Sequence, residues 1–193
     1  MARLVFVCTV NRMRSVMAHY LFKDLLAQKK ALAQEIHVSS AGIVLDGQIQ
    51  KLEGTGIKIP DPLFGYRPQP CVLFHMAMRG LNVSEHRSMP LTSTTAHEAD
   101  LIITITRSHE HNVLAVYPHL KNKVAALEEL SYPFQLPEIA HEPPGLMPRD
   151  EFCMRDCDRW HIARKMMLET EERLIAAADK ILIRSRIRTV TDE

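Results

Sequence analysis

The sequence predicts an α/β domain in three layers, with a doubly wound, four-stranded parallel sheet covered by helices on both faces. The first observation is that short apolar runs rich in β-forming residues alternate with segments of helical periodicity. The second is the length of 193 residues with a near-average composition, which suits a single domain spanning residues 1–193. Since parallel strands are joined by crossover connections, the alternation indicates successive βαβ units.

The four predicted strands are short and mostly apolar. Residues 3–8 form a run that is too short for a helix and typical of a buried parallel strand, ending at Cys8. The others are predicted at residues 36–40, 101–105 and 124–127.

Four segments have helical periodicity, at residues 15–30, 69–80, 108–117 and 159–187. We expect the last and longest of them to pack on one face of the sheet. Two stretches rich in glycine and proline, residues 42–70 and 132–148, are predicted to be irregular. Long loops in compact domains are often functional, so both are candidates for site-forming segments.

Charge and composition exclude several classes of partner. Lys and Arg total 24 against 23 Asp and Glu, so there is no basic field to bind nucleic acid. No apolar stretch reaches membrane-spanning length, and no secretion signal is visible, so we expect a cytoplasmic protein without a membrane partner. The 4 cysteines are then reduced thiols, which allows a reactive one.

The turn after the first strand carries the most informative spacing, a cysteine followed by five residues and then Arg-Ser. A loop that closes onto a helix N-terminus directs backbone N–H groups inward, where the helix dipole also favours an anion. Arg14 would add a planar, bidentate fork, and the same environment would favour the thiolate of Cys8 as a nucleophile. The predicted phosphate cup consists of Thr9, Val10, Asn11, Arg12, Met13 and Ser15.

Two residues of this loop have further expected roles. Asn11 tolerates left-handed backbone angles and would hold the loop in a tight arc, and the Ser15 hydroxyl would stabilise the thiolate. Position alone also allows a plain structural interpretation, in which Cys8 is a small buried residue and Arg14 only begins a helix.

The segment resembles the phosphate-binding loop of the low-molecular-weight protein tyrosine phosphatase family, including its arsenate reductase relatives. Further matches follow in family order to about residue 118, at residues 38–42, at 80–88 with His86-Arg87-Ser88, and at 99–104. The resemblance implies the flavodoxin-like topology and a structural, hydrogen-bonding role for His86-Arg87-Ser88. It does not extend to arsenate reduction, because the segment directly after the second helix contains no pair of cysteines.

The resemblance also implies a reaction in two steps. Cys8 attacks phosphorus to form a phosphocysteine, with Arg14 clamping the phosphate, and water then releases it without a metal or another cofactor. The expected substrate is a phosphorylated protein, with phosphotyrosine as the favoured residue, or a small aryl phosphate, and phosphate or another oxyanion would inhibit.

In the family, the general acid is the aspartate of an Asp-Pro pair in the C-terminal third. Here Glu142-Pro143 stands at that place, which makes Glu142 the candidate acid and Asp150 the alternative. Asp61-Pro62 has the right dipeptide too early in the chain and is interpreted as a turn. Together with the β-branched Val10, this departure leaves a second hypothesis, a catalytically weak or inactive phosphate- or phosphoprotein-binding module.

Two other groups of residues have both functional and structural interpretations. Cys153, Cys157 and His161 are spaced by four and could share a helix face, but they lack an evident fourth ligand, so no metal is assigned. Tyr132, Phe134 and Trp160 are candidates for the walls of a slot that admits an aromatic ring, or else they are core residues.

Overall fold

The computed structural model describes residues 1–29, 35–45, 49, 63–131 and 157–191, with side chains in the last range described for 165–185. It contains a sheet of four parallel strands, β1 (Ala2–Cys8), β2 (Ile36–Gly42), β3 (Leu101–Thr104) and β4 (Val124–Ala126). Their order is β2-β1-β3-β4. The predicted doubly wound sheet and its flavodoxin-like order are therefore confirmed.

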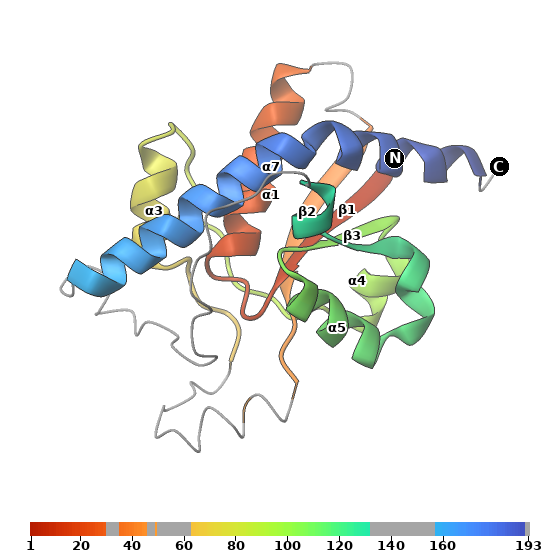
Figure 1. Cartoon of the computed structure of the whole chain (residues 1–193), viewed down its shortest axis with the longest axis horizontal. Helices are drawn as coiled ribbons and strands as arrows, with labels where there is room; N and C mark the ends of the chain where they lie inside the picture. The colour runs from red at the N-terminus through yellow and green to blue at the C-terminus, as the bar shows by residue number, and fades with distance from the viewer. Residues whose placement is uncertain (30–34, 46–48, 50–62, 132–156, 192–193) are drawn as a thin grey trace.

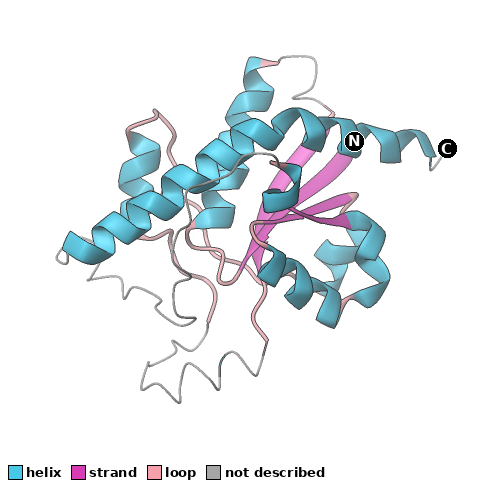
Figure 2. Ribbon diagram, viewed as in Figure 1, coloured by secondary structure: helices cyan, strands magenta, loops and turns pink. Residues whose placement is uncertain are grey.

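Helices cover both faces of the sheet (Figures 1 and 2). Helices α1 (Arg14–Gln28) and α7 (Cys157–Thr191) lie on one face, with α3 (Pro70–Ala77) packed beside them. Helices α4 (Ser93–Glu98) and α5 (Arg107–Val116) lie on the other. The short 3₁₀ helix η1 (Pro118–Lys123) precedes β4, and α6 (Leu127–Leu130) follows it.

Strand β1 supplies side chains to both layers, which explains its continuous apolar sequence. Leu4 and Phe6 enter the core shared with α1 and α7, where Phe6 meets the edge of the Phe22 ring at a centroid distance of 5.6 Å. Val5 and Val7 enter the opposite core beneath α4 and α5. The central strand is thus buried on both faces, and its C-terminal residue, Cys8, is only 4% exposed.

The structure also contains elements that the sequence pattern did not predict. Helix α4 reads Ser-Thr-Thr-Ala-His-Glu and has no apolar stripe, but the Thr92 hydroxyl caps it by accepting from Thr95 N at 3.1 Å. Leu127, predicted as the end of the fourth strand, begins α6 instead. Helix α3 ends at Ala77, before residue 80, because the chain turns at Gly80 with φ of +72°.

The topology brings two strand ends together. From β1 the chain moves to β2 on one side and later returns to β3 on the other, so the order reverses between β1 and β3. In doubly wound sheets this switch point opens a crevice at the carboxyl ends of the strands. The segments after Cys8 and after Thr104 both lie there. Within the part of the chain that the structure describes, no helix is long and apolar enough to cross a membrane.

Candidate active site

The Cys8–Ser15 segment lies between the carboxyl end of β1 and the start of α1. Cys8 ends the strand and Arg14 begins the helix, so the loop between them is seated at the helix N-terminus. The Cys8 Sγ and Ser15 Oγ atoms are 3.0 Å apart, and Ser15 is fully buried. The structure therefore brings the predicted nucleophile and the predicted hydroxyl into direct contact.

Asn11 is the central hydrogen-bonding residue of the loop. Its side chain is fully buried, and its φ of +54° is the left-handed conformation that the sequence led us to expect. The Nδ2 atom donates to Ser15 Oγ at 2.9 Å, and Oδ1 accepts from Met89 N at 3.1 Å. Because Ser15 Oγ accepts from Asn11, its own proton is available to donate to the Cys8 sulfur.

His86 supports Asn11 from outside the loop. Its Nε2 lies 3.0 Å from Asn11 Oδ1, and since a carbonyl oxygen only accepts, His86 carries its proton on Nε2. Burial and the nearby Arg87 charge lower the pKa of His86, so the ring is neutral at pH 7. Its edge contacts the rings of His19 and Tyr20, at centroid distances of 6.3 and 6.0 Å. The expected hydrogen-bonding role of the His86-Arg87-Ser88 segment has its physical basis here.

A second histidine, His109, joins the loop to the start of α5. Its Nε2 is 3.0 Å from Thr9 Oγ1, and its Nδ1 is 2.8 Å from Oγ1 of Thr106, the N-cap of α5. Burial and the nearby Arg14 guanidinium lower the pKa of His109 to about 3. His109 is therefore a neutral link between the carboxyl ends of β1 and β3.

Gly42, the last residue of β2, permits close packing beside the loop. A Cβ atom there would lie 2.7 Å from the Thr9 carbonyl oxygen, 2.7 Å from Phe64 Cε1 and 3.0 Å from Asn11 N. The Phe64 ring thus packs closely against Gly42, on the strand end beside the loop. Any residue other than glycine would push the loop or the ring away.

The segment around residues 64–69 forms the adjoining rim. Arg12 donates from Nε to the Arg67 carbonyl at 3.1 Å, and its guanidinium lies 5.1 Å from the centre of the Tyr66 ring. Gln69 N donates in turn to the Arg12 carbonyl at 3.0 Å. Residues near the end of the predicted irregular stretch, 42–70, therefore bind the loop on its outer side.

Arg14 is half-buried as the first residue of α1, and no described side chain caps that helix N-terminus. The first N–H groups of a helix have no partner within it, so they and the Arg14 charge favour a bound anion. The switch point therefore carries the groups that covalent phosphoryl transfer needs. The cysteine thiol can act as the nucleophile, and the arginine and the helix N-terminus can stabilise negative charge on the phosphoryl group.

The structure places some predicted residues in the loop and leaves others outside the described residues. Thr9, Val10, Arg12 and Met13 are half-buried members of it. Among the described residues other than glycine, only Asn11 has positive φ, so Val10 avoids the conformation that a β-branched side chain resists. Outside the described residues lie Glu142, Asp150, Asp61-Pro62, Tyr132, Phe134 and Cys153, and so do the side chains of Cys157, Trp160 and His161.

Sequence reasoning missed two neighbours of the loop, His109, which contacts Thr9, and Phe64, which packs against Gly42. A usable signal existed for His109, since it follows the third strand at the start of a helix, where the neighbouring strand end also lies. Phe64 had no such signal, because its neighbours in sequence form no periodic element.

A buried cysteine, the Arg-Ser pair at a helix start and the doubly wound sheet together define a phosphatase that uses cysteine as its nucleophile. Comparison with known proteins then gives the family. The family described as low molecular weight phosphotyrosine protein phosphatase matches residues 3–138, and the chain belongs to it. The protein is accordingly a cysteine-dependent hydrolase of the low-molecular-weight protein-tyrosine-phosphatase type.

Two relatives illustrate the range of the family. A probable low molecular weight protein-tyrosine-phosphatase EpsP of Ralstonia solanacearum is 28% identical over 127 residues, covering 66% of this chain and 71% of that protein. A protein-arginine-phosphatase of Bacillus subtilis is 29% identical over 126 residues, covering 65% and 70%.

Solved structures share the fold. A YwlE mutant from Bacillus subtilis has a TM-score of 0.63 at 22% identity and covers 94% of this chain and 99% of its own. A low molecular weight protein tyrosine phosphatase from T. tengcongensis has a TM-score of 0.62 at 23% identity, covering 93% and 99%.

Proposed function

We propose that the protein hydrolyses phosphate from phosphorylated protein side chains, primarily phosphotyrosine, through a phosphocysteine on Cys8. The Cys8 sulfur attacks phosphorus, the bond from phosphorus to the tyrosine oxygen breaks, and the tyrosine leaves. Water then attacks the phosphocysteine, which releases inorganic phosphate and restores the thiolate. The observation that carries the proposal is the Cys8 sulfur 3.0 Å from Ser15 Oγ at the start of α1.

The hydrogen bonds of the loop support this role for Cys8. Asn11 donates to Ser15, which orients the Ser15 hydroxyl proton toward sulfur, and a hydrogen bond to a thiolate favours the charged form. Arg14 would bind two phosphate oxygens and match the charge that develops on them during transfer. The backbone of Thr9, Val10, Asn11, Arg12 and Met13 would complete the cup, with Ser15 at its base.

The rim supports an aromatic substrate. The Phe64 ring packs against Gly42 and the Tyr66 ring lies under Arg12, so two aromatic rings lie next to the loop that would bind the phosphate. Tyr132, Phe134 and Trp160 remain predicted additions to this wall.

Glu142 is proposed as the general acid that protonates the leaving oxygen and later activates water, with Asp150 as the alternative. Proton transfer to the leaving group matters most when that group is a poor one. We therefore expect Glu142→Gln to lose more rate on phenyl phosphate than on para-nitrophenyl phosphate, while Asp150→Asn loses the same fraction on both. The reverse pattern would transfer the role to Asp150.

The central test compares para-nitrophenyl phosphate hydrolysis by the wild type with that by Cys8→Ser and Arg14→Lys. Cys8→Ser should abolish turnover and retain phosphate binding, whereas Arg14→Lys should weaken both. Cys71→Ala is the matched control, because Cys71 is also a buried cysteine but belongs to the core between α1 and α3. Turnover that survives in Cys8→Ser would exclude the covalent mechanism.

The two relatives motivate a second candidate substrate. One is named a protein-tyrosine-phosphatase and the other a protein-arginine-phosphatase, at 28% and 29% identity. Parallel measurement of kcat/KM on a phosphotyrosine peptide and a phosphoarginine peptide decides between the two. Tight phosphate or vanadate binding without turnover on either would support the catalytically inactive, phosphate-binding alternative instead.

Two further parts of the proposal concern the whole chain. We propose that residues 1–193 act as one domain, since Leu174 and Ile181 of α7 are buried in the same core as Leu4 and Phe6 of β1. A cytoplasmic location is also proposed, because a reducing compartment keeps the Cys8 thiol free for catalysis.

A further inference from the structure

Two exposed histidines face each other at the end of the molecule opposite Cys8. His97 lies in α4, which leads into the amino end of β3, and His119 lies in η1, which leads into the amino end of β4. Their Nε2 atoms are 3.0 Å apart, while the ring centroids are 4.7 Å apart with planes inclined by 29°. The rings thus approach each other at their Nε2 ends, on two residues that are both exposed.

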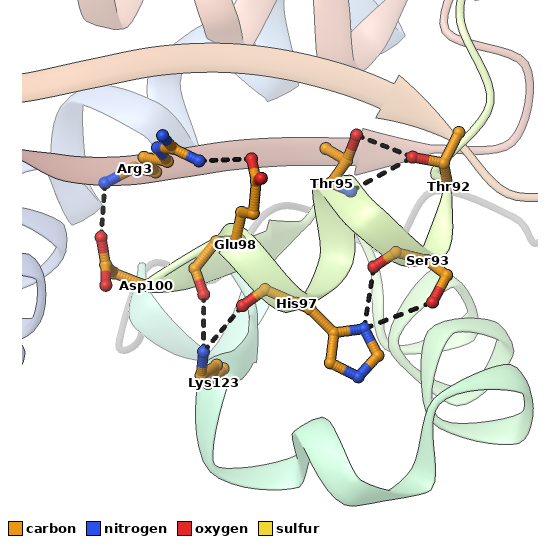
Figure 3. Close-up of polar contacts among 9 residues, drawn as sticks. Arg3, Thr92, Ser93, Thr95, His97, Glu98, Asp100 and Lys123 are labelled. Carbon is orange, nitrogen blue, oxygen red and sulfur yellow. Dashed lines mark hydrogen bonds and ion pairs between the residues drawn. The ribbon is translucent and has the colours of Figure 1, made fainter.

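The hydrogen bonds of His97 determine where its proton lies. Its Nδ1 is 2.8 Å from the Ser93 carbonyl oxygen, which can only accept, so the neutral ring carries its proton on Nδ1 (Figure 3). The Nε2 atom of His97 therefore has a lone pair, which accepts a hydrogen bond from His119 Nε2–H in this structure. Histidines that bind metals characteristically donate their other ring N–H to a backbone carbonyl or a carboxylate, as His97 does here.

Both rings are held by their surroundings. Lys123, the last residue of η1, donates from Nζ to the carbonyl oxygens of His97 at 3.1 Å and Ala99 at 3.0 Å (Figure 3). The His119 ring lies against the Tyr117 ring at a centroid distance of 6.4 Å, and the Tyr117 hydroxyl donates to the Leu91 carbonyl at 3.1 Å. The two segments are thereby fixed to each other, and the approach of the histidines needs no further ordering.

We propose that His97 and His119 form a surface site for one divalent transition-metal ion of the borderline class, such as Ni²⁺, Cu²⁺ or Zn²⁺. These ions bind neutral imidazole at about 2.0–2.1 Å, and two such bonds to nitrogens 3.0 Å apart enclose an angle of about 90°. His119 moves its proton from Nε2 to Nδ1 on binding, so each ring donates one Nε2 lone pair. Water fills the other positions, since both side chains are exposed.

The site is distinct from the phosphatase centre, and the proposal does not depend on the proposed function. Within the described residues, no group of three or more histidine, cysteine or acidic side chains is placed to hold a metal, so the protein supplies two ligands. A bound ion would connect α4 to η1 at the amino edge of the sheet. Its direct effect is on the stability of that edge, not on the chemistry at Cys8.

The first experiment titrates Ni²⁺ into the untagged full-length chain by calorimetry. The wild type should bind one equivalent at this site, and His97→Gln or His119→Gln should each weaken that binding by more than about tenfold, because the second contact is intramolecular. The matched control is the double variant His37→Gln/His111→Gln, which removes two exposed histidines elsewhere and should bind like the wild type. Every variant retains the same cysteines, so thiol binding cancels in the comparison.

A second measurement separates metal binding from the lost contact between the rings. Ni²⁺ should raise the unfolding midpoint of the wild type and of the control, but not that of His97→Gln/His119→Gln. In Zn²⁺ titrations followed by NMR, the Nε2 resonances of His97 and His119 should shift together. Equal Ni²⁺ affinity in the wild type and in the His97→Gln/His119→Gln double variant would overturn the proposal, as would Zn²⁺ shifts at other histidines only.

Discussion

Replacing Asn11 by alanine tests whether one side chain holds the phosphate loop in shape. In the native protein, Asn11 donates to Ser15 and accepts from Met89 N and His86 Nε2. Alanine would leave both of those donors without this partner in a partly buried place, and it would have to occupy a φ of +54°. We expect Asn11→Ala to lower both the free energy of unfolding and the rate of hydrolysis.

The magnitude follows from these losses. Each unpaired buried donor costs about 1–3 kcal/mol. The left-handed conformation costs alanine about 1–2 kcal/mol. Since the two donors here are only partly buried, their loss lies at the low end of that range, and the free energy of unfolding should fall by about 3 kcal/mol in all, which for a chain of this size lowers the midpoint by roughly 6–12 °C.

The rate should fall as well, because Ser15 is no longer oriented toward the Cys8 sulfur. We expect a loss on the order of 10- to 100-fold in kcat, which is the effect of misplacing a catalytic group slightly. Thermal and urea unfolding measure the first quantity, and para-nitrophenyl phosphate hydrolysis well below the midpoint measures the second.

Asn11→Gly is the control that separates the two causes. Glycine adopts positive φ without cost, so this variant loses the hydrogen bonds and keeps the backbone conformation. It should be more stable than Asn11→Ala by about 1 kcal/mol and be impaired in rate to a similar degree. If Asn11→Ala unfolds within about 0.5 kcal/mol of the wild type, the range typical of exposed sites, the reasoning is refuted.

Three more predictions test other parts of the structure. Gly42→Ala places a Cβ 2.7 Å from a loop carbonyl, so it should lower the free energy of unfolding by about 1–3 kcal/mol and remove most of the phosphatase activity. Gly80→Ala, with open space around the new Cβ, should keep the kcat of the wild type. The pKa of His109 is about 3 in the fold and 6.5 when unfolded, so its titration alone should lower the free energy of unfolding by about 2 kcal/mol between neutral pH and pH 5, and His109→Gln should remove that part of the decline in urea titrations. Leu174, on the side of α7 that faces the sheet, is fully buried, so Leu174→Ala should lower the free energy of unfolding by about 2–5 kcal/mol in thermal unfolding, and Ile175→Ala, at a side chain 60% exposed, by almost nothing; equal losses would contradict the packing of α7.

The sheet was predictable because its strands are buried on both faces, which leaves a continuous apolar run in the sequence. The long helices were predictable from their apolar periodicity. Helix α4 escaped prediction because its six residues are mostly polar and are stabilised by the Thr92 cap instead of an apolar stripe. The end of α3 at Ala77 depends on the turn at Gly80, whose φ of +72° the periodicity does not show.

The sequence by itself determined the phosphate loop, since Cys8, Asn11, Arg14 and Ser15 lie within eight residues and local geometry joins a strand end to a helix start. Only the tertiary structure decided what supports that loop. His86 and His109 reach it from 75 and 100 residues away along the chain. Such contacts depend on which strand ends meet at the switch point, and no local pattern encodes that meeting. The contact between His97 and His119 likewise depends on the tertiary structure. The two residues lie in α4 and η1, which precede the neighbouring strands β3 and β4.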